Sequence, residues 1–366
     1  MRRLAPLTVL LLVFAQRLLA QAPGLDAAKV SAVEAAVGAE MQRQKLIGVA
    51  VAVVADGQLA YARGFGFADR ERYVPVTGAT LFRWASVSKP VTAIAAMQLV
   101  EQGKLGLDDD VRKYVPEFPE KDETITVRQL LCHQGGIVHY TNGKVVVTER
   151  KYDAEHPFAD VVTALDTFKD SPLVARPGTK YSYTTHGYIL LSAVVQRAGS
   201  RTFADQVLER VARPLGMESF RPDYQWEAIS GRAVGYVRKG DEIARSTDTD
   251  VSWKLGGGGY LSNVADMARF GAGLIDRKLL RPETAARMWE PQKTADGKET
   301  TYGLGFQVEH KNGRLTVAHS GAQEKTRTQL IVLPHEGRAV AVMTNSEYGR
   351  PDAVAKAVLT AVGVEP

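Results

Sequence analysis

The fold of this chain is decided by residues 82–92, which read Phe82-Arg83-Trp84-Ala85-Ser86-Val87-Ser88-Lys89-Pro90-Val91-Thr92. Apolar residues after Ser86 recur at the spacing of one helical face, and Gly103 offers a stop. The pattern predicts a buried helix that ends near Gln102. On a helix, residues three apart share a face, so the Ser86 hydroxyl and the Lys89 amine come within hydrogen-bond reach. The stretch therefore predicts a nucleophile paired with a base.

This pairing has a chemical requirement that a helix entry helps to meet. A serine hydroxyl reacts after its proton is removed, and a lysine removes that proton only when burial or a nearby positive charge lowers the lysine pKa. Free N–H groups and the positive dipole end disfavour the protonated amine, and the Ser86 N–H is a candidate for half of an oxyanion hole. The alternative is a helix cap followed by a solvated lysine, because Ser-x-x-Lys occurs by chance about once or twice in such a chain.

Residues 1–22 have the composition of a secretory signal. Arg2 and Arg3 precede an apolar run from Val9 to Ala15, and small residues follow at Ala20 and Ala22. The run is too short to span a bilayer, and no cysteine stands nearby to accept a lipid. We therefore predict a periplasmic or secreted protein, with a mature chain of residues 23–366 and no stable membrane anchor after cleavage.

Composition excludes several classes of protein. The chain has 366 residues, of which 45% are hydrophobic, enough for one large domain or two lobes. Its single cysteine, Cys132, allows no internal disulfide and is interpreted as a small buried hydrophobe. A net charge of +5 without a long basic run gives no case for nucleic acid. The histidines lack metal-ligand spacing, so neither a metal nor a cofactor is predicted.

The order of the predicted elements indicates the architecture. A helix over residues 25–45 and a hairpin around Asp56-Gly57 come first, a mostly helical middle follows, and strands return near Tyr302 before a closing helix over residues 352–362. This order predicts an α/β (α+β) fold, with an antiparallel sheet built from both chain ends and flanked by helices. The predicted sheet lobe is residues 23–80 plus 295–366, and the inserted helical lobe is residues 81–294.

Four consecutive glycines, Gly256 to Gly259, stand in the predicted helical lobe. Because glycine has no side chain, such a run lets the backbone pass close to another part of the molecule. A phosphate cradle is the alternative, but no Gly-Lys-Ser/Thr follows and no strand clearly precedes the run. We predict a close backbone approach.

Three ordered motifs resemble those of the penicillin-recognising serine hydrolases, which include class C β-lactamases, D-alanyl-D-alanine peptidases and related esterases. The motifs are Ser86-x-x-Lys89, Tyr183-x-Thr185 and His319-Ser320-Gly321. Two further stretches extend the resemblance over nearly the whole mature chain, namely residues 130–136 and 257–262. Residues 114–119 and 136–140 are most similar to the lactamase-beta-like serine proteases, which also occur in mitochondria. The resemblance implies a β-lactamase/transpeptidase-like fold.

Roles for the motif residues follow from this resemblance and from their chemistry. Ser86 would form the acyl-enzyme, with Lys89 as its base. Tyr183 would relay a proton to the leaving group once Lys89 lowers the tyrosine pKa; the alternative is a buried packing tyrosine. The strand through Gly321 would lie along an extended substrate, and the Ala322 N–H would complete the oxyanion hole.

Two predicted substrate-binding residues depart from the family pattern. Thr185 stands where most relatives have Asn, and His319 stands where β-lactamases have Lys. A neutral histidine and a short hydroxyl should hold the carboxylate of a β-lactam less well than lysine and an amide. We therefore expect uncharged short acyl esters or peptide amides to be hydrolysed faster than penicillins or cephalosporins.

Three functions compete. The first is an exported serine hydrolase that acts through Ser86 on a peptide, amide or ester bond of a small-molecule or peptide substrate. The second is a true β-lactamase or D-alanyl-D-alanine peptidase. The third is a non-catalytic binding or scaffold protein, against which the intact Ser86, Lys89 and Tyr183 argue. An α/β-hydrolase is disfavoured because no Gly-x-Ser-x-Gly occurs. The sequence leaves the oligomeric state open.

Overall fold

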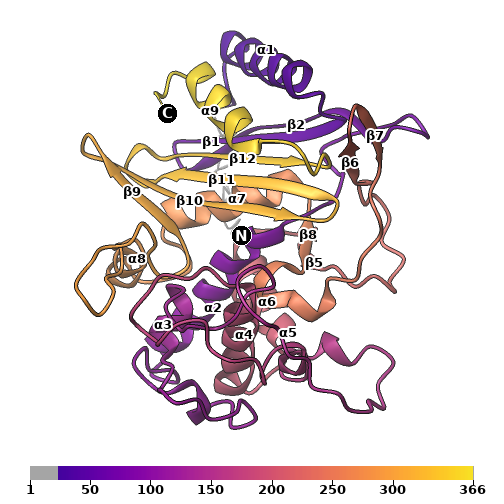
Figure 1. Ribbon diagram of the computed structural model, residues 1–366. Coiled ribbons are helices and arrows are strands. Elements are labelled where there is room, and N and C mark those ends of the chain that lie inside the picture. Colours follow the sequence, from indigo (N-terminus) through magenta and orange to yellow (C-terminus); the bar gives the residue numbers. More distant parts are fainter. Residues whose placement is uncertain (1–23, 366) are drawn as a thin grey trace, which may run out of the picture.

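A seven-stranded antiparallel sheet forms the centre of the molecule, in the strand order β3-β2-β1-β12-β11-β10-β9 (Figure 1). The computed structural model describes residues 24–365. Strand β1 (Gly48–Ala55) pairs with β2 (Gln58–Asp69) on one side and with β12 (Arg338–Thr344) on the other. The two ends of the chain therefore meet in the middle of the sheet, which confirms the predicted architecture.

The other strands of the sheet form its two edges. β3 (Val74–Pro75) continues from β2, while β11 (Thr326–Leu333), β10 (Arg314–Gln323) and β9 (Gln307–Lys311) follow from β12. The predicted hairpin turn joins β1 to β2, and Asp56 and Gly57 both have positive φ, at 50° and 71°. Such a turn matches the right-handed twist of the strands that it connects.

The side chains of β1 point alternately to the two faces of the sheet. One face lies against α1 (Ala27–Gln44) and α9 (Pro351–Ala361), which share a core with Val49, Val51 and Val53. The opposite face lies against α7 (Val264–Ile275), and its core contains Ala50, Ala52 and Val54. Successive strand side chains point to opposite faces, so one apolar strand serves two layers of helices.

The assignment of α7 needs a correction. The lobe boundaries predicted from element order place it in the helical lobe of residues 81–294, yet it packs on β1, β2, β11 and β12. Order along the chain does not show which layer a helix joins, because a loop can return it to the sheet. The lobe boundaries otherwise stay a prediction.

The helical region lies below the sheet in Figure 1 and is built around α2 (Ser88–Glu101). Eleven of the residues in α2 are buried, among them the polar Ser88, Lys89 and Thr92, so nearly every side of this helix is covered by protein. It contacts α4 (Thr185–Gly199), α5 (Phe203–Val207) and the short α6 (Leu255–Gly258), while α3 (Val127–Leu131) packs on α4. A π-helical turn at Leu208–Ala212 follows α5, and a 3₁₀ helix at Thr163–Thr167 precedes α4.

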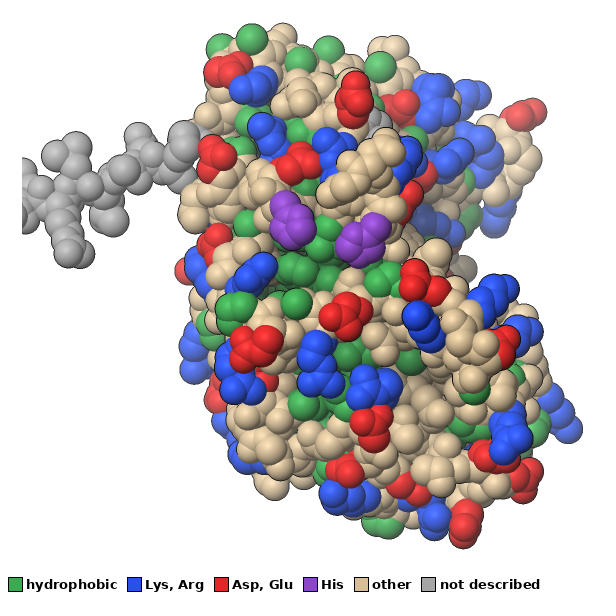
Figure 2. Space-filling view, turned by 90° about the vertical axis from the view of Figure 1, so that its left-hand side faces the viewer, with side chains coloured by type: hydrophobic (Ala, Val, Ile, Leu, Met, Phe, Trp, Pro, Cys, Tyr) green, Lys and Arg blue, Asp and Glu red, His purple; other side chains and the backbone are tan. Residues whose placement is uncertain are grey.

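Smaller elements complete the described chain. A three-stranded sheet is formed by β4 (Phe82–Arg83), β8 (Tyr260–Ser262) and β5 (Arg221–Pro222). The predicted surface hairpin is β6 (Tyr236–Lys239) with β7 (Glu242–Arg245), and α8 (Pro282–Met288) precedes β9. On the face shown in Figure 2, basic and acidic side chains are mixed over most of the surface.

The predicted secretory signal, residues 1–22, lies outside the described residues. Between residues 24 and 365, no helix combines the length and the hydropathy needed to cross a membrane.

Candidate active site

Ser86 lies in a single 3₁₀ turn, Ala85–Val87, directly before α2. The turn is rigid: Trp84 is fully buried and its indole N–H donates to Ser262 Oγ at 2.6 Å. Ala85 has φ 48°, in the left-handed region that side chains other than glycine rarely adopt. Its flanking residues are buried while Ser86 is partly exposed. The turn therefore presents the Ser86 hydroxyl to the surface from a fixed backbone.

Lys89 is fully buried and touches three groups, two of which come from distant parts of the chain. Its Nζ lies 3.0 Å from Ser86 Oγ, 3.1 Å from Thr185 Oγ1 and 2.8 Å from the Gly257 carbonyl oxygen. Burial holds the pKa of Lys89 well below its usual range, and the positive charge of Lys254 lowers it further. The predicted conditions for a neutral lysine are thus present.

The three contacts match the bonding capacity of a neutral amine. A neutral amine has two N–H donors and one lone pair. The Gly257 carbonyl oxygen can only accept, so it takes one N–H; when the Thr185 hydroxyl accepts the other, the lone pair is left for Ser86. The lone pair is then directed at Ser86, whose hydroxyl can donate to it over 3.0 Å. This arrangement suits removal of the Ser86 proton by Lys89.

The four glycines make the close approach that the sequence predicts, and they make it to α2 and α4. The Gly256 carbonyl accepts from Thr92 Oγ1 at 2.6 Å, beside the bond from Lys89 to Gly257. A Cβ added to Gly257 would lie 2.6 Å from Thr185 Cγ2. The glycine run was the sequence signal for this contact, but its partner, Lys89, was not predicted.

Tyr183 reaches the site from the segment before α4, where Thr184 caps the helix by accepting from the Gly187 N–H. Its ring lies 4.8 Å from Lys89 Nζ and packs on the His133 ring, at a centroid distance of 4.3 Å. Burial raises the pKa of Tyr183, and the nearby Ser86 hydroxyl opposes that rise more weakly. The prediction that Lys89 lowers this pKa is wrong, because burial removes the lysine charge that would do so. Tyr183 is therefore a protonated phenol.

Two neutral histidines hold the Tyr183 segment in place. The Thr184 N–H donates to His133 Nδ1 and the Thr185 N–H donates to His139 Nδ1, each at 3.2 Å. Burial lowers the pKa of both rings, to about 4 for His139. His133 lies in residues 130–136 and His139 in residues 136–140, two stretches that carry the family resemblance, and both rings accept backbone hydrogen bonds.

Strand β10 lies against the Ser86 turn. A Cβ on Gly321 would lie 2.6 Å from the Trp84 carbonyl oxygen and 2.2 Å from Thr328 Oγ1. Only glycine permits this approach. Ala322, the next residue, is exposed. The structure thus brings Gly321 and Ala322 to the nucleophile turn, while the oxyanion hole formed by the Ser86 and Ala322 N–H groups stays a prediction.

His319 and Thr185 lie in the site but face protein groups. His319 is 2% exposed; its Nδ1 donates to the Ser320 carbonyl at 2.7 Å, so its Nε2 accepts from the Tyr302 hydroxyl at 2.9 Å. Burial lowers the pKa of His319 to about 3. Thr185 is also 2% exposed and its hydroxyl contacts Lys89. The polar atoms of both side chains thus already have protein partners, and their direct contact with substrate stays a prediction.

The close packing of Gly321 supports a stability prediction. We expect Gly321→Ala to lower the free energy of unfolding by about 1–3 kcal/mol, because overpacking displaces neighbouring groups, and to reduce activity by moving β10 from the Ser86 turn. Gly38→Ala is the control: it lies within α1 with no atom near its added Cβ, and should stabilise by up to about 1 kcal/mol. Urea unfolding measures both. If both variants changed the free energy of unfolding by the same small amount, the close approach of Gly321 to the Ser86 turn would be contradicted.

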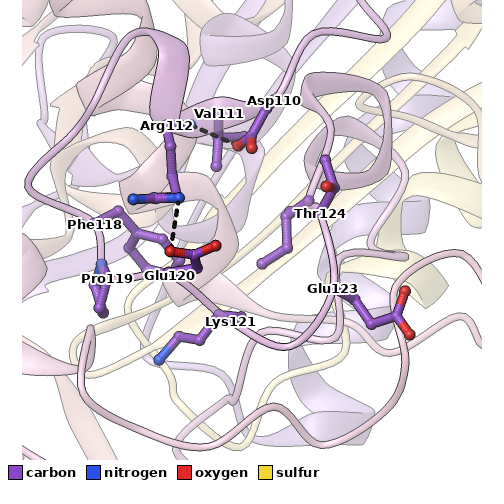
Figure 3. Close-up of a pocket in the computed structure, with 10 residues that line it drawn as sticks. Asp110, Val111, Arg112, Phe118, Pro119, Glu120, Lys121, Glu123 and Thr124 are labelled. Atoms are coloured by element: carbon purple, nitrogen blue, oxygen red, sulfur yellow. Dashed lines mark hydrogen bonds and ion pairs between the residues drawn. The ribbon is translucent and has the colours of Figure 1, made fainter.

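Other concave or titratable regions do not extend the site. Figure 3 shows a pocket between residues 110 and 125, where Arg112 pairs with Glu120 at 3.6 Å. None of its lining residues is a predicted site residue. Over residues 24–365, no group of three or more His, Cys, Asp or Glu side chains is arranged to hold a metal ion. Burial raises the pKa of the Cys132 thiol to about 12, consistent with a packing role.

A partly exposed serine whose hydroxyl lies 3.0 Å from the amine of a buried lysine, with a tyrosine ring beside them, is the arrangement expected of a serine hydrolase. Residues 33–365 match the family described as Beta-lactamase, and the chain belongs to this family of serine hydrolases. Its relatives include a protein named D-aminopeptidase from Gluconobacter oxydans and one named Esterase EstB from Burkholderia gladioli. This confirms the resemblance on which the motif assignment rests.

Individual relatives support the same conclusion. The chain is 29% identical over 378 residues to the human "Serine beta-lactamase-like protein LACTB, mitochondrial", covering 79% of this chain and 69% of that protein. It is 30% identical over 260 residues to "Putative penicillin-binding protein PbpX" of Bacillus subtilis, covering 70% and 61%. An octameric penicillin-binding protein homologue from Pyrococcus abyssi superimposes with a TM-score of 0.78 at 26% identity, covering 92% and 78%.

Proposed function

We propose that this chain is an exported hydrolase that forms an acyl-enzyme on Ser86 and cleaves a peptide, amide or ester bond of a small molecule or peptide. The observation that carries the proposal is the set of contacts at Lys89, which leaves a lone pair for the Ser86 hydroxyl proton. Export is the part of the proposal that rests on the composition of residues 1–22.

The proposed reaction has two halves. Lys89 takes the Ser86 proton while Ser86 Oγ attacks the carbonyl carbon, and the Ser86 and Ala322 N–H groups stabilise the oxyanion. The Tyr183 phenol gives its proton to the leaving group and regains one from Lys89 as the C–N or C–O bond breaks. A water molecule then attacks the acyl-enzyme, and the proton it loses restores Ser86. Lys89 and Tyr183 thus act as base and acid of one proton path.

The protonation states lead to a prediction about pH. Protonating Lys89 removes the base, so kcat/KM for a neutral ester should fall as pH drops through the pKa of Lys89 and stay level above it. The raised pKa of Tyr183 keeps the acid protonated into the alkaline range. A profile from about pH 5 to about pH 10 checks this.

A variant gives the pH profile an internal control. Because the charge of Lys254 is the second cause of the low Lys89 pKa, Lys254→Met should move the acid limb to higher pH. An activity that falls as pH rises from neutrality would contradict a neutral Lys89 base.

Substrate class separates the first hypothesis from a true β-lactamase or D-alanyl-D-alanine peptidase. Because His319 is neutral and both its nitrogens are paired, it offers no charge to the carboxylate of a β-lactam. We expect kcat/KM to be at least about tenfold higher for 4-nitrophenyl butyrate than for a chromogenic cephalosporin, the loss of one charged hydrogen bond. A higher value for the cephalosporin would favour the β-lactamase alternative.

Labelling tests all three functions at once. A fluorescent phosphonate reacts with activated serines of any hydrolase, whereas a fluorescent penicillin requires β-lactam recognition. The proposed hydrolase should react readily with the phosphonate and poorly with the penicillin. Failure of both labels would favour the non-catalytic scaffold and overturn the proposal.

A further inference from the structure

Lys254 is a buried cation with an incomplete set of partners. It ends the 3₁₀ turn Ser252–Lys254, directly before α6, and its side chain is 9% exposed. Its Nζ lies 3.5 Å from Glu324 Oε2 and 5.5 Å from the centre of the Trp253 ring, and among the described residues it has no second ion pair. An ammonium has three donors, and a largely buried one is costly unless its charge is paired. The single, long ion pair leaves Lys254 able to take a further anionic partner.

The Lys254–Glu324 pair lies at one end of the proposed site. Glu324 stands in the turn between β10 and β11, two residues after Ala322. Gly258 in α6 lies close to both neighbouring elements. A Cβ added to it would lie 3.1 Å from Oε1 of Gln323, the last residue of β10, and 3.5 Å from the carbonyl carbon of Ala85 in the Ser86 turn. These three elements therefore meet at this end of the site. The charge of Lys254 is also felt at Lys89, whose pKa it lowers. The ion pair thus joins two elements of the site.

The chain differs in charge on the two sides of Ala322. His319, three residues before Ala322 within β10, is neutral with both nitrogens paired. Glu324, two residues after Ala322, has Lys254 as its ion-pair partner. The expectation of an uncharged substrate considered only the His319 end, because the sequence alone did not place Lys254 in the site.

We propose that Lys254 binds a carboxylate carried by the substrate, at the end of the site opposite His319. This inference rests on the proposed function and names its substrate class: acyl esters or amides with an anionic group on one side of the scissile bond. Glu324 is 46% exposed, so it can turn into solvent when the substrate carboxylate takes its place. The exchange replaces one anion with another, and the buried cation gains hydrogen bonds.

The test compares two ligands that differ only in the anionic group. The 4-nitroanilide of adipic acid carries a free carboxylate, and its methyl ester is neutral. Their binding to Ser86→Ala protein at fixed ionic strength requires no turnover. We expect the acid to bind at least about tenfold more tightly than the ester, as for one charged hydrogen bond.

Variants assign the preference to one side chain. Adding Lys254→Met should remove the preference, Lys254→Arg should retain it, and Glu324→Gln should increase it by removing the competing carboxylate. Lys325→Met is the matched control: Lys325 lies in the same turn but pairs with Asp248, so its loss removes an equal charge and should leave the preference intact. A preference that is absent, survives Lys254→Met or is lost with Lys325→Met would overturn the inference.

Turnover separates this inference from the proposed function. In protein with Ser86 intact, the kcat/KM ratio of the matching adipate 4-nitrophenyl esters should change in the same way with each variant, and the ratio cancels any effect of Lys254 on the base. If neither ester is hydrolysed, the proposed function fails while the binding preference still decides the role of Lys254. If the two esters are hydrolysed equally and the two anilides bind equally, the inference is overturned. The Lys254–Glu324 ion pair then only connects the turn before α6 with the turn between β10 and β11.

Discussion

Ser86→Ala is expected to abolish covalent labelling and to lower kcat/KM by about 10³-fold or more, because the variant has no atom that can carry the acyl group. Its free energy of unfolding should stay within about 0.5 kcal/mol of the wild type, since a partly exposed hydroxyl contributes little to folding. Labelling with a phosphonate, followed by peptide mass spectrometry, measures the first effect. Thermal unfolding measures the second.

Two neighbouring serines provide controls for this prediction. Ser88 is fully buried in the same stretch, and Ser320 is exposed on β10 beside Gly321. Ser88→Ala and Ser320→Ala should both retain labelling at Ser86. An adduct found on Ser88 or Ser320 in the wild type would exclude Ser86 as the nucleophile.

Lys89→Met and Tyr183→Phe are each expected to slow acylation by about 10²–10⁴-fold, the usual effect of removing a general base or acid. Methionine fills the buried volume of Lys89 without an amine, and phenylalanine keeps the Tyr183 ring against His133. The double variant should be little slower than the worse single variant, because groups that act as a unit are not additive. Single-turnover acylation of an ester measures these rates.

Tyr188 supplies the matched control for the tyrosine. Its ring lies 5.8 Å from Lys89 Nζ, but its hydroxyl donates to the Leu131 carbonyl at 2.8 Å, so it has a structural partner. Tyr188→Phe should cost about 1 kcal/mol of stability and leave acylation much less affected than Tyr183→Phe. Losses that multiply in the Lys89 and Tyr183 double variant would argue against a shared proton path.

Local sequence patterns predicted much of this molecule because they depend on neighbours a few residues apart. The three-residue spacing of Ser86 and Lys89 brought the two side chains together at the helix entry, as the 3.0 Å contact shows. The apolar runs on either side of Asp56-Gly57 identified the first hairpin. The order of elements predicted a sheet built from both chain ends, and in the structure β1 pairs with β12. The glycine run predicted a close backbone approach.

The tertiary structure alone decided the charges and partners in the site. The pKa of Lys89 is low because Lys89 is buried between Thr185 and Gly257, which lie far from it along the chain. His319 is hydrogen-bonded at both nitrogens because Tyr302 packs against it. Lys254 meets Glu324 only where α6 approaches the β10 turn. Desolvation and pairing depend on which distant segments pack together, and local spacing does not specify that.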